Sequence, residues 1–125
     1  MANELKIEAT ITLTNGSLAY KKQPGAKYVT QTNAKVYAEV KSVSTSDAAL
    51  TFGGLASSEH GWLYITNLDS TNYVDIGPDS GGAIVPLVRI KAGESVGPFR
   101  VKPSITIRSQ ANTGACSCEF VMIAT

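Results

Sequence analysis

The sequence predicts an all-β protein, folded as a single antiparallel β-sandwich of jelly-roll-like or Greek-key type, with no substantial helix. Apolar and polar residues alternate with a period of two through most of the chain, which is the pattern of half-buried strands. Clusters of Gly, Pro, Asn and Asp recur about every ten residues, as they do between the short strands of sandwiches. No segment repeats apolar residues at helical spacing.

The first predicted element is a strand over residues 5–13, because five apolar residues alternate there with four polar ones. The apolar set is Leu5, Ile7, Ala9, Ile11 and Leu13. Asn15-Gly16 follows, and this dipeptide is a strong signal for a two-residue hairpin turn. Residues 17–22 are then the returning strand, which Gln23-Pro24-Gly25 ends.

The next predicted strands cover residues 28–32 and 35–43, with an interruption near Asn33. Within residues 35–43, alternation places Val36, Ala38 and Val40 on one face and the residues between them on the other. A short strand is expected at residues 50–52, before Gly53-Gly54.

In the second half, residues 62–67 and 73–77 are predicted to form a hairpin joined by residues 68–72. Residues 83–90 are predicted to form a buried strand, with Pro86 marking an edge or a bulge. Residues 95–101, 105–110 and 116–124 are predicted to complete the sandwich.

A chain of 125 residues that is 43% hydrophobic has the length and composition of one globular domain with its own core. Its halves do not repeat each other, and no Pro- or Ser-rich linker divides them. We therefore predict a single domain over residues 1–125, with residues 1–14 as a strand or arm engaged with a neighbouring subunit.

Charge and hydropathy point toward assembly rather than secretion or membrane insertion. Only 17% of residues are charged and the net charge is +1, so little repulsion keeps neighbouring copies apart. The N-terminal residues do not resemble a signal peptide, and no apolar run approaches the roughly 20 residues that a membrane span needs. We expect a protein that is not secreted and does not contact a membrane.

Motifs for metal binding are weak. Cys116 and Cys118 point to one face of a strand, where we expect free thiols of the core or an interface. The only histidine, His60, is distant in sequence. The oxygen-rich region from Asp69 to Asp79 contains ligands that calcium prefers, but its spacing differs from that of an EF-hand, so a solvated turn is the better interpretation.

Catalytic motifs are also weak. Asp79-Ser80-Gly81-Gly82 resembles the nucleophile stretch of chymotrypsin-like proteases, but Pro78 replaces its first glycine. His60, the sole candidate base, lies 20 residues before Ser80, and the chain is too short for the two barrels of that family. No pair of carboxylates can be nominated for acid–base chemistry. We predict that the protein is not an enzyme and binds no cofactor or metal.

Basic residues gather late in the chain, at Arg89, Lys91, Arg100, Lys102 and Arg108. Nucleic-acid binders usually combine such stripes with a higher net charge and several aromatic residues, so we expect no direct nucleic-acid contact. Solvated strand faces, or a surface for an acidic protein partner, explain them better. The single tryptophan, Trp62, is expected in the core or an interface, with sugar stacking as the alternative.

Four segments together resemble a pattern found in small structural proteins of tailed bacteriophages. They are residues 61–77 (GWLYITNLDSTNYVDIG), 82–87 (GAIVPL), 90–94 (IKAGE) and 109–114 (SQANTG). The resemblance covers the last two-thirds of the chain. It implies a virion protein with a β-sandwich fold.

We therefore predict a capsid decoration (cement) protein that binds the assembled phage head and stabilises it. Its partner would be the major capsid protein, its own assembly a homo-oligomer, with a trimer favoured, and its location the virion, assembled in the host cytoplasm. The alternatives are a neck, tail or fibre component, or a carbohydrate- or receptor-binding module. The residues predicted to make oligomer or capsid contacts are Leu5, Ile7, Ile11, Leu13, Trp62, Arg89, Arg100, Arg108 and Phe120.

Overall fold

The computed structural model describes residues 4–125, which form two compact units, each considered by itself. Residues 4–32 form an arm, and residues 33–125 form the body. The arm therefore extends well past residue 14, the end of the predicted arm. Residues 1–3 of the predicted arm lie outside the described residues.

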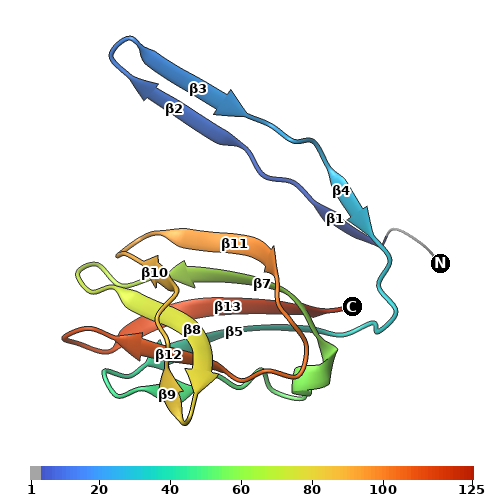
Figure 1. The fold of residues 1–125 in the computed structure, drawn as a ribbon, viewed down its shortest axis with the longest axis vertical. Coiled ribbons are helices and arrows are strands. Elements are labelled where there is room, and N and C mark those ends of the chain that lie inside the picture. The colour runs from blue at the N-terminus through green and yellow to red at the C-terminus, as the bar shows by residue number, and fades with distance from the viewer. Residues whose placement is uncertain (1–3) are drawn as a thin grey trace. The chain divides into compact units, whose positions relative to one another are not determined.

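The arm is a two-stranded antiparallel ribbon (Figure 1). Near its base β1 (Leu5–Ile7) pairs with β4 (Lys27–Val29), and near its tip β2 (Ile11–Asn15) pairs with β3 (Leu18–Lys22). The predicted hairpin is confirmed, but its two-residue loop is Gly16-Ser17, one residue later than expected. Gly16 takes a φ of 59°, which glycine adopts without steric cost.

The strand predicted over residues 5–13 is interrupted at residues 8–10. The reason lies in the opposite strand. Pro24 has no N–H to donate and Gly25 takes a φ of 81°, so the ladder of backbone hydrogen bonds cannot continue across this point.

The body is a sandwich of two antiparallel sheets, which confirms the predicted fold class (Figure 1). The first sheet has the order β11-β7-β13-β5 and the second the order β10-β8-β12-β6, with β9 paired to β8. The strands are β5 (Val36–Val43), β6 (Ala48–Ala49), β7 (His60–Asn67), β8 (Val74–Ser80), β9 (Ala83–Ile84), β10 (Val88–Ile90), β11 (Ser95–Arg100), β12 (Ile107–Ala111) and β13 (Cys116–Ala124).

Apart from β8, β9 and β10, consecutive strands of the body lie in opposite sheets, and the resulting order is that of an eight-stranded jelly roll. A single 3₁₀ turn, η1 (Ser57–Glu59), precedes β7. Within residues 4–125 there is no helix of the length and apolar character that a membrane span requires.

The core lies between the two sheets and is filled by alternate residues of their strands. It includes Val43, Phe52, Leu63, Ile65, Val74, Ile76, Ile90, Val101, Ile107, Phe120 and Met122. Cys116 and Cys118 belong to it as free, fully buried thiols, as predicted. Burial raises the pKa of both thiols, that of Cys118 to about 12, so neither is poised for reaction in the folded protein.

The predicted hairpin of residues 62–67 and 73–77 is wrong. β7 and β8 lie in different sheets, and residues 68–73 form an arch that carries the chain from one sheet to the other. A sequence pattern of two strands and a turn does not distinguish a hairpin from such an arch, because both need the same turn-forming residues between the strands.

The predicted buried strand over residues 83–90 is divided into β9 and β10. Residues 85–87 between them stay beside β8, where the N–H groups of Val85 and Leu87 donate to the carbonyls of Pro78 and Ile76, and the Leu87 side chain is 79% exposed. The backbone of these residues lies so close to Gly77 that a side chain at residue 77 would collide with the carbonyl group of Val85. Pro86 favours this break because it offers no N–H to a sheet.

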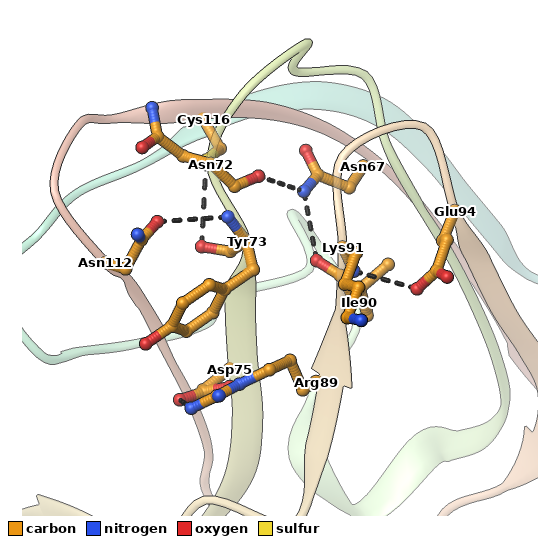
Figure 2. A network of polar contacts seen from close by, with 10 residues as sticks. All are labelled: Asn67, Asn72, Tyr73, Asp75, Arg89, Ile90, Lys91, Glu94, Asn112 and Cys116. Carbon is orange, nitrogen blue, oxygen red and sulfur yellow. Dashed lines mark hydrogen bonds and ion pairs between the residues drawn. The ribbon is translucent and has the colours of Figure 1, made fainter.

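The arch after β7 is held by the buried side chain of Asn67, shown in Figure 2. Its amide nitrogen donates to the carbonyl oxygens of Asn72 (2.9 Å) and Ile90 (3.0 Å). Its amide oxygen accepts from the backbone N–H of Asp69 at 3.0 Å. One side chain thus joins the end of β7 to the arch and to the last residue of β10.

The turns around Asn67 are closed by two carboxylates. Asp69 accepts from the backbone N–H groups of Thr71 and Asn72, at 2.9 and 2.6 Å. Glu94 accepts from the N–H of Lys91 at 3.0 Å in the turn that follows β10. Asp is a usual turn former for this reason, and the bonds to Asp69 occupy an oxygen atom of the region considered for calcium.

Replacing Asn67 by Ala should destabilise the body by about 3 kcal/mol, because it leaves the buried carbonyl of Ile90, the partly buried carbonyl of Asn72 and the N–H of Asp69 without this partner. Urea unfolding followed through Trp62 fluorescence measures the loss. Asn112→Ala is the matched control, since Asn112 accepts an exposed backbone hydrogen bond from Tyr73, which water can replace. Equal losses in the two variants would contradict the role given to Asn67.

Candidate interaction surfaces

The outer face of the second sheet is charged and internally paired. Arg89 makes two hydrogen bonds to Asp75, at 2.8 and 3.1 Å, and its guanidinium lies 3.8 Å from the centre of the Tyr73 ring (Figure 2). Arg108 binds Asp47 at 2.7 Å and Asp79 at 3.1 Å.

Arg89 and Arg108 were both predicted as partner contacts, and the structure engages both with carboxylates of the same chain. The hydrogen bond from Arg108 is the main reason that the pKa of Asp47 lies below its usual value. This face therefore resembles an ordinary solvated surface with satisfied charges.

The outer face of the first sheet is apolar. The strand register places Val36, Ile123 and Trp62 side by side across β5, β13 and β7. The next row of outward side chains is Ala38, Val121 and Tyr64, and the third is Val40, Glu119 and Thr66. We call the seven apolar and aromatic members the outer sheet face: Val36, Ala38, Val40, Trp62, Tyr64, Val121 and Ile123.

β5 is one edge strand of this sheet, since it pairs only with β13, and β11 is the other. Val36 and Val40 are 65% and 53% exposed, whereas Tyr37 on the opposite face packs edge-on against the core residue Phe52, with ring centres 5.8 Å apart. The predicted alternation of β5 is confirmed. Its more apolar side, however, faces outward.

Two strands of this sheet carry apolar residues on both faces. Residues 62–65 of β7 and 120–124 of β13 are uninterrupted runs of apolar and aromatic side chains. Such runs are typical of strands that are covered on both sides, whereas a half-solvated strand alternates with polar residues. The runs are visible in the sequence, but Tyr64, Val121 and Ile123 were not among the predicted contacts, nor were Val36 and Val40 of β5.

Trp62 and Arg100 lie together at one end of the outer sheet face, as neighbours in the β7–β11 register, with the guanidinium 5.8 Å from the indole centre. Trp62 is half-buried, and its indole N–H has no hydrogen-bond partner in the described part of the chain. It is the third residue of β7, whereas the arch of residues 68–73 begins where β7 ends, about 17 Å away at the usual rise of a strand.

Phe120 does not belong to any surface, which corrects its prediction as a contact residue. It is completely buried between the sheets, with its ring centre 6.3 Å from that of Phe52. The strand that carries Phe120, β13, is also unable to add to the sheet of another molecule. β13 lies between β5 and β7, so its backbone groups already have partners on both sides.

The tip of the arm has one apolar face. Directly opposed residues of a ribbon share a face, so the pairs Leu13–Tyr20, Ile11–Lys22 and Asn15–Leu18 point the same way. The apolar members are 62% (Ile11), 44% (Leu13), 56% (Leu18) and 54% (Tyr20) exposed. We call these four residues the arm face.

The other predicted arm contacts, Leu5 and Ile7, lie in β1 and are half-buried. The reverse side of the tip carries Thr12, Thr14, Ala19 and Lys21. Because an isolated two-stranded ribbon is at best marginally stable in water, the arm face needs a surface to pack on.

The residues singled out for catalysis do not form a catalytic arrangement. Ser80 is exposed at the tight β8–β9 turn, where Asp79 accepts the N–H of Gly82. His60 is buried, its ring 5.0 Å from that of Phe52, and burial lowers its pKa. Residues 4–125 contain no group of three His, Cys, Asp or Glu side chains placed to hold a metal ion.

An apolar cavity of about 240 Å³ opens between the sheets beside β11. Leu63, Ile76, Leu87 and Phe99 are among its lining residues, and its only charged neighbours are Arg100 and Lys102. No carboxylate, histidine or thiol lines it, so it offers no group for acid–base or nucleophilic chemistry.

The entry to β5 is fixed by Glu59, the last residue of η1. Its carboxylate accepts from the Lys35 ammonium (2.6 Å), the Asn33 amide (2.8 Å) and the backbone N–H of Ala56 (3.0 Å). These bonds, that from Lys35 first, lower the pKa of Glu59 from 4.5 to about 2. They hold the edge strand of the outer sheet face in place at its start.

Comparison with known proteins gives no relative: no family model matches the chain, and neither the curated proteins nor the solved structures searched contain a match.

A carboxylate whose pKa is lowered by folding stabilises the folded state above its unfolded pKa and loses that effect as the pH falls through the folded pKa. The stability advantage of the wild type over Glu59→Gln should therefore be constant near neutral pH and shrink between about pH 4.5 and 2. Urea unfolding at a series of pH values measures it. Lys35→Met should raise the pKa of Glu59 in an NMR titration, and an unchanged pKa would contradict the assignment.

Proposed function

We propose that this chain is a structural protein of a virus particle, and specifically a decoration protein that binds the assembled capsid. The observation that carries the proposal is the pair of apolar surfaces described above, the arm face and the outer sheet face. A chain with a charge-poor composition and two such surfaces is suited to burial against other protein molecules.

Two further arguments support a virion. The sequence pattern of residues 61–114 resembles that of small phage structural proteins. Jelly rolls are also common in viral capsid domains, although they occur in lectins and enzymes as well, so the fold alone is an analogy. A subunit that binds only the assembled shell stabilises that shell by mass action and needs no catalytic group.

The partner we propose is the major capsid protein, bound by a small symmetric oligomer. Shells offer repeated local symmetry axes, and a trimer matches the three-fold positions. The exposed residues Arg100 and Leu87 lie outside the two apolar surfaces and are available for a contact with the capsid.

The alternative is a neck, tail or fibre protein, which also needs surfaces that bind other virion proteins. It would be present in far fewer copies per particle than a decoration protein. A carbohydrate-binding module is less well supported by the geometry. Trp62 is half-buried and lies near the start of β7, away from the arch of residues 68–73, so the two do not combine into one sugar site.

The decisive measurement is the copy number of this chain in purified particles, by quantitative mass spectrometry against the major capsid protein. We expect a ratio near one to one or a simple fraction of it. A few copies per particle would replace the decoration role by a neck or tail role. Absence from particles would overturn the virion proposal.

A further inference from the structure

The outer sheet face is an apolar surface on which Val36 and Val40 are exposed and Trp62, Tyr64, Val121 and Ile123 are partly exposed, and the arm face is an exposed apolar surface. The first is a flat surface of valine, isoleucine and aromatic side chains on three strands. The second is the apolar side of a ribbon whose reverse side is polar. A ribbon with this division is built to lie flat, with one side against protein and the other in water.

We propose that the arm face of one copy of this chain packs on the outer sheet face of a second copy. The contact covers both surfaces of every copy, because each molecule donates one arm and receives another. The inference concerns self-association only and does not depend on the proposed role in a virion.

The dimensions of the two surfaces agree. Neighbouring strands are about 4.8 Å apart, so the three strands β5, β13 and β7 span about 10 Å between their axes. The ribbon of β2 and β3 is one strand spacing wide, and its apolar residues Ile11 to Leu13 and Leu18 to Tyr20 fit within this width. Aromatic residues occur on both sides, with Tyr20 on the arm and Trp62 and Tyr64 on the sheet.

Charge favours the same pairing. Among the described residues, Glu119 is the one carboxylate that alternation directs outward from β5, β7 and β13, and it sits between Val40 and Thr66. Lys22 opposes Ile11 on the arm face. The described arm carries four lysines and two glutamates, whereas residues 33–125 carry eight acidic and seven basic residues, so an arm and a body attract each other weakly.

A contact between two different surfaces of identical molecules is heterologous, and it closes into a ring when the rotation that it imposes closes. A closed ring leaves no arm face and no outer sheet face exposed. The proposed oligomer is such a ring, with each arm extending to the next subunit.

The first test is the concentration dependence of the oligomeric state of the purified full chain, by analytical ultracentrifugation. Leu13→Lys on the arm and Val121→Lys on the sheet should each weaken association roughly tenfold or more, because each places a charge where an apolar side chain is buried. The matched controls are Thr12→Lys on the reverse side of the arm and Gln110→Lys on the outer face of the second sheet. Both controls should associate like the wild type.

Urea unfolding of each variant excludes loss of the fold as the cause of weaker association. All four positions point away from the core, so the unfolding midpoints of the body should stay near that of the wild type. Association that is equally strong in all four variants would overturn the proposal.

Cross-linking decides whether the arm reaches a second copy. Leu13→Cys chains are mixed with Val121→Cys chains and treated with a short bismaleimide, to which the buried Cys116 and Cys118 are not accessible. The proposal expects a cross-linked dimer containing one chain of each kind, and little of it when Thr12→Cys replaces Leu13→Cys. A Leu13→Cys/Val121→Cys double variant that cross-links only within one monomer would overturn it.

These experiments use the purified chain without any virus particle. A monomeric chain found abundantly in particles would refute the arm contact and leave the decoration role intact. A chain that forms rings but is absent from particles would support the arm contact and refute the decoration role.

Discussion

The amide side chain of Asn67 connects the parts of the body that the jelly roll must bring together. It lies where β7 of the first sheet ends, and it bonds to the arch that leads into β8 and to the end of β10, both in the second sheet. A buried amide is stable only when its polar groups are satisfied, so the residue fixes the separation and the relative register of the two sheets at this end. The other elements of the sandwich depend on that spacing, because the core residues of both sheets interdigitate below it.

The outer faces of the two sheets differ in chemistry, because the second sheet presents paired charges and the first presents mainly apolar side chains. On the second sheet each arginine has its carboxylates, and the polar groups need nothing further. On the first sheet the same alternation that fills the core also places valine, isoleucine and aromatic residues outward. The hydrophobic effect that closes the sandwich therefore continues to act on its exterior, and it favours association of this one face.

The sequence was informative where structure is local. The period of two predicted the fold class, and Asn15-Gly16 predicted the hairpin. The spacing of Cys116 and Cys118 predicted two free, buried thiols on one face of a strand. The sequence did not predict features that depend on contacts between segments far apart in the chain. Whether residues 62–67 and 73–77 form a hairpin or an arch depends on Asn67 and its partner Ile90, which lies 23 residues away. Phe120 was assigned to a surface because alternation divides residues into two faces without saying which face is covered.

Because Cys116 and Cys118 are buried, the rate at which they react with a thiol reagent measures how often the body opens. Both thiols lie on β13, the strand between β5 and β7, beneath the outer sheet face. A thiol reacts as the thiolate, and burial both shields these sulfurs and disfavours that form. Labelling at these positions therefore proceeds through molecules in which β13 has come out of the core, and its rate reports the free energy of that opening. Whatever covers the first sheet from outside should slow this reaction, because a strand held on both sides opens less often.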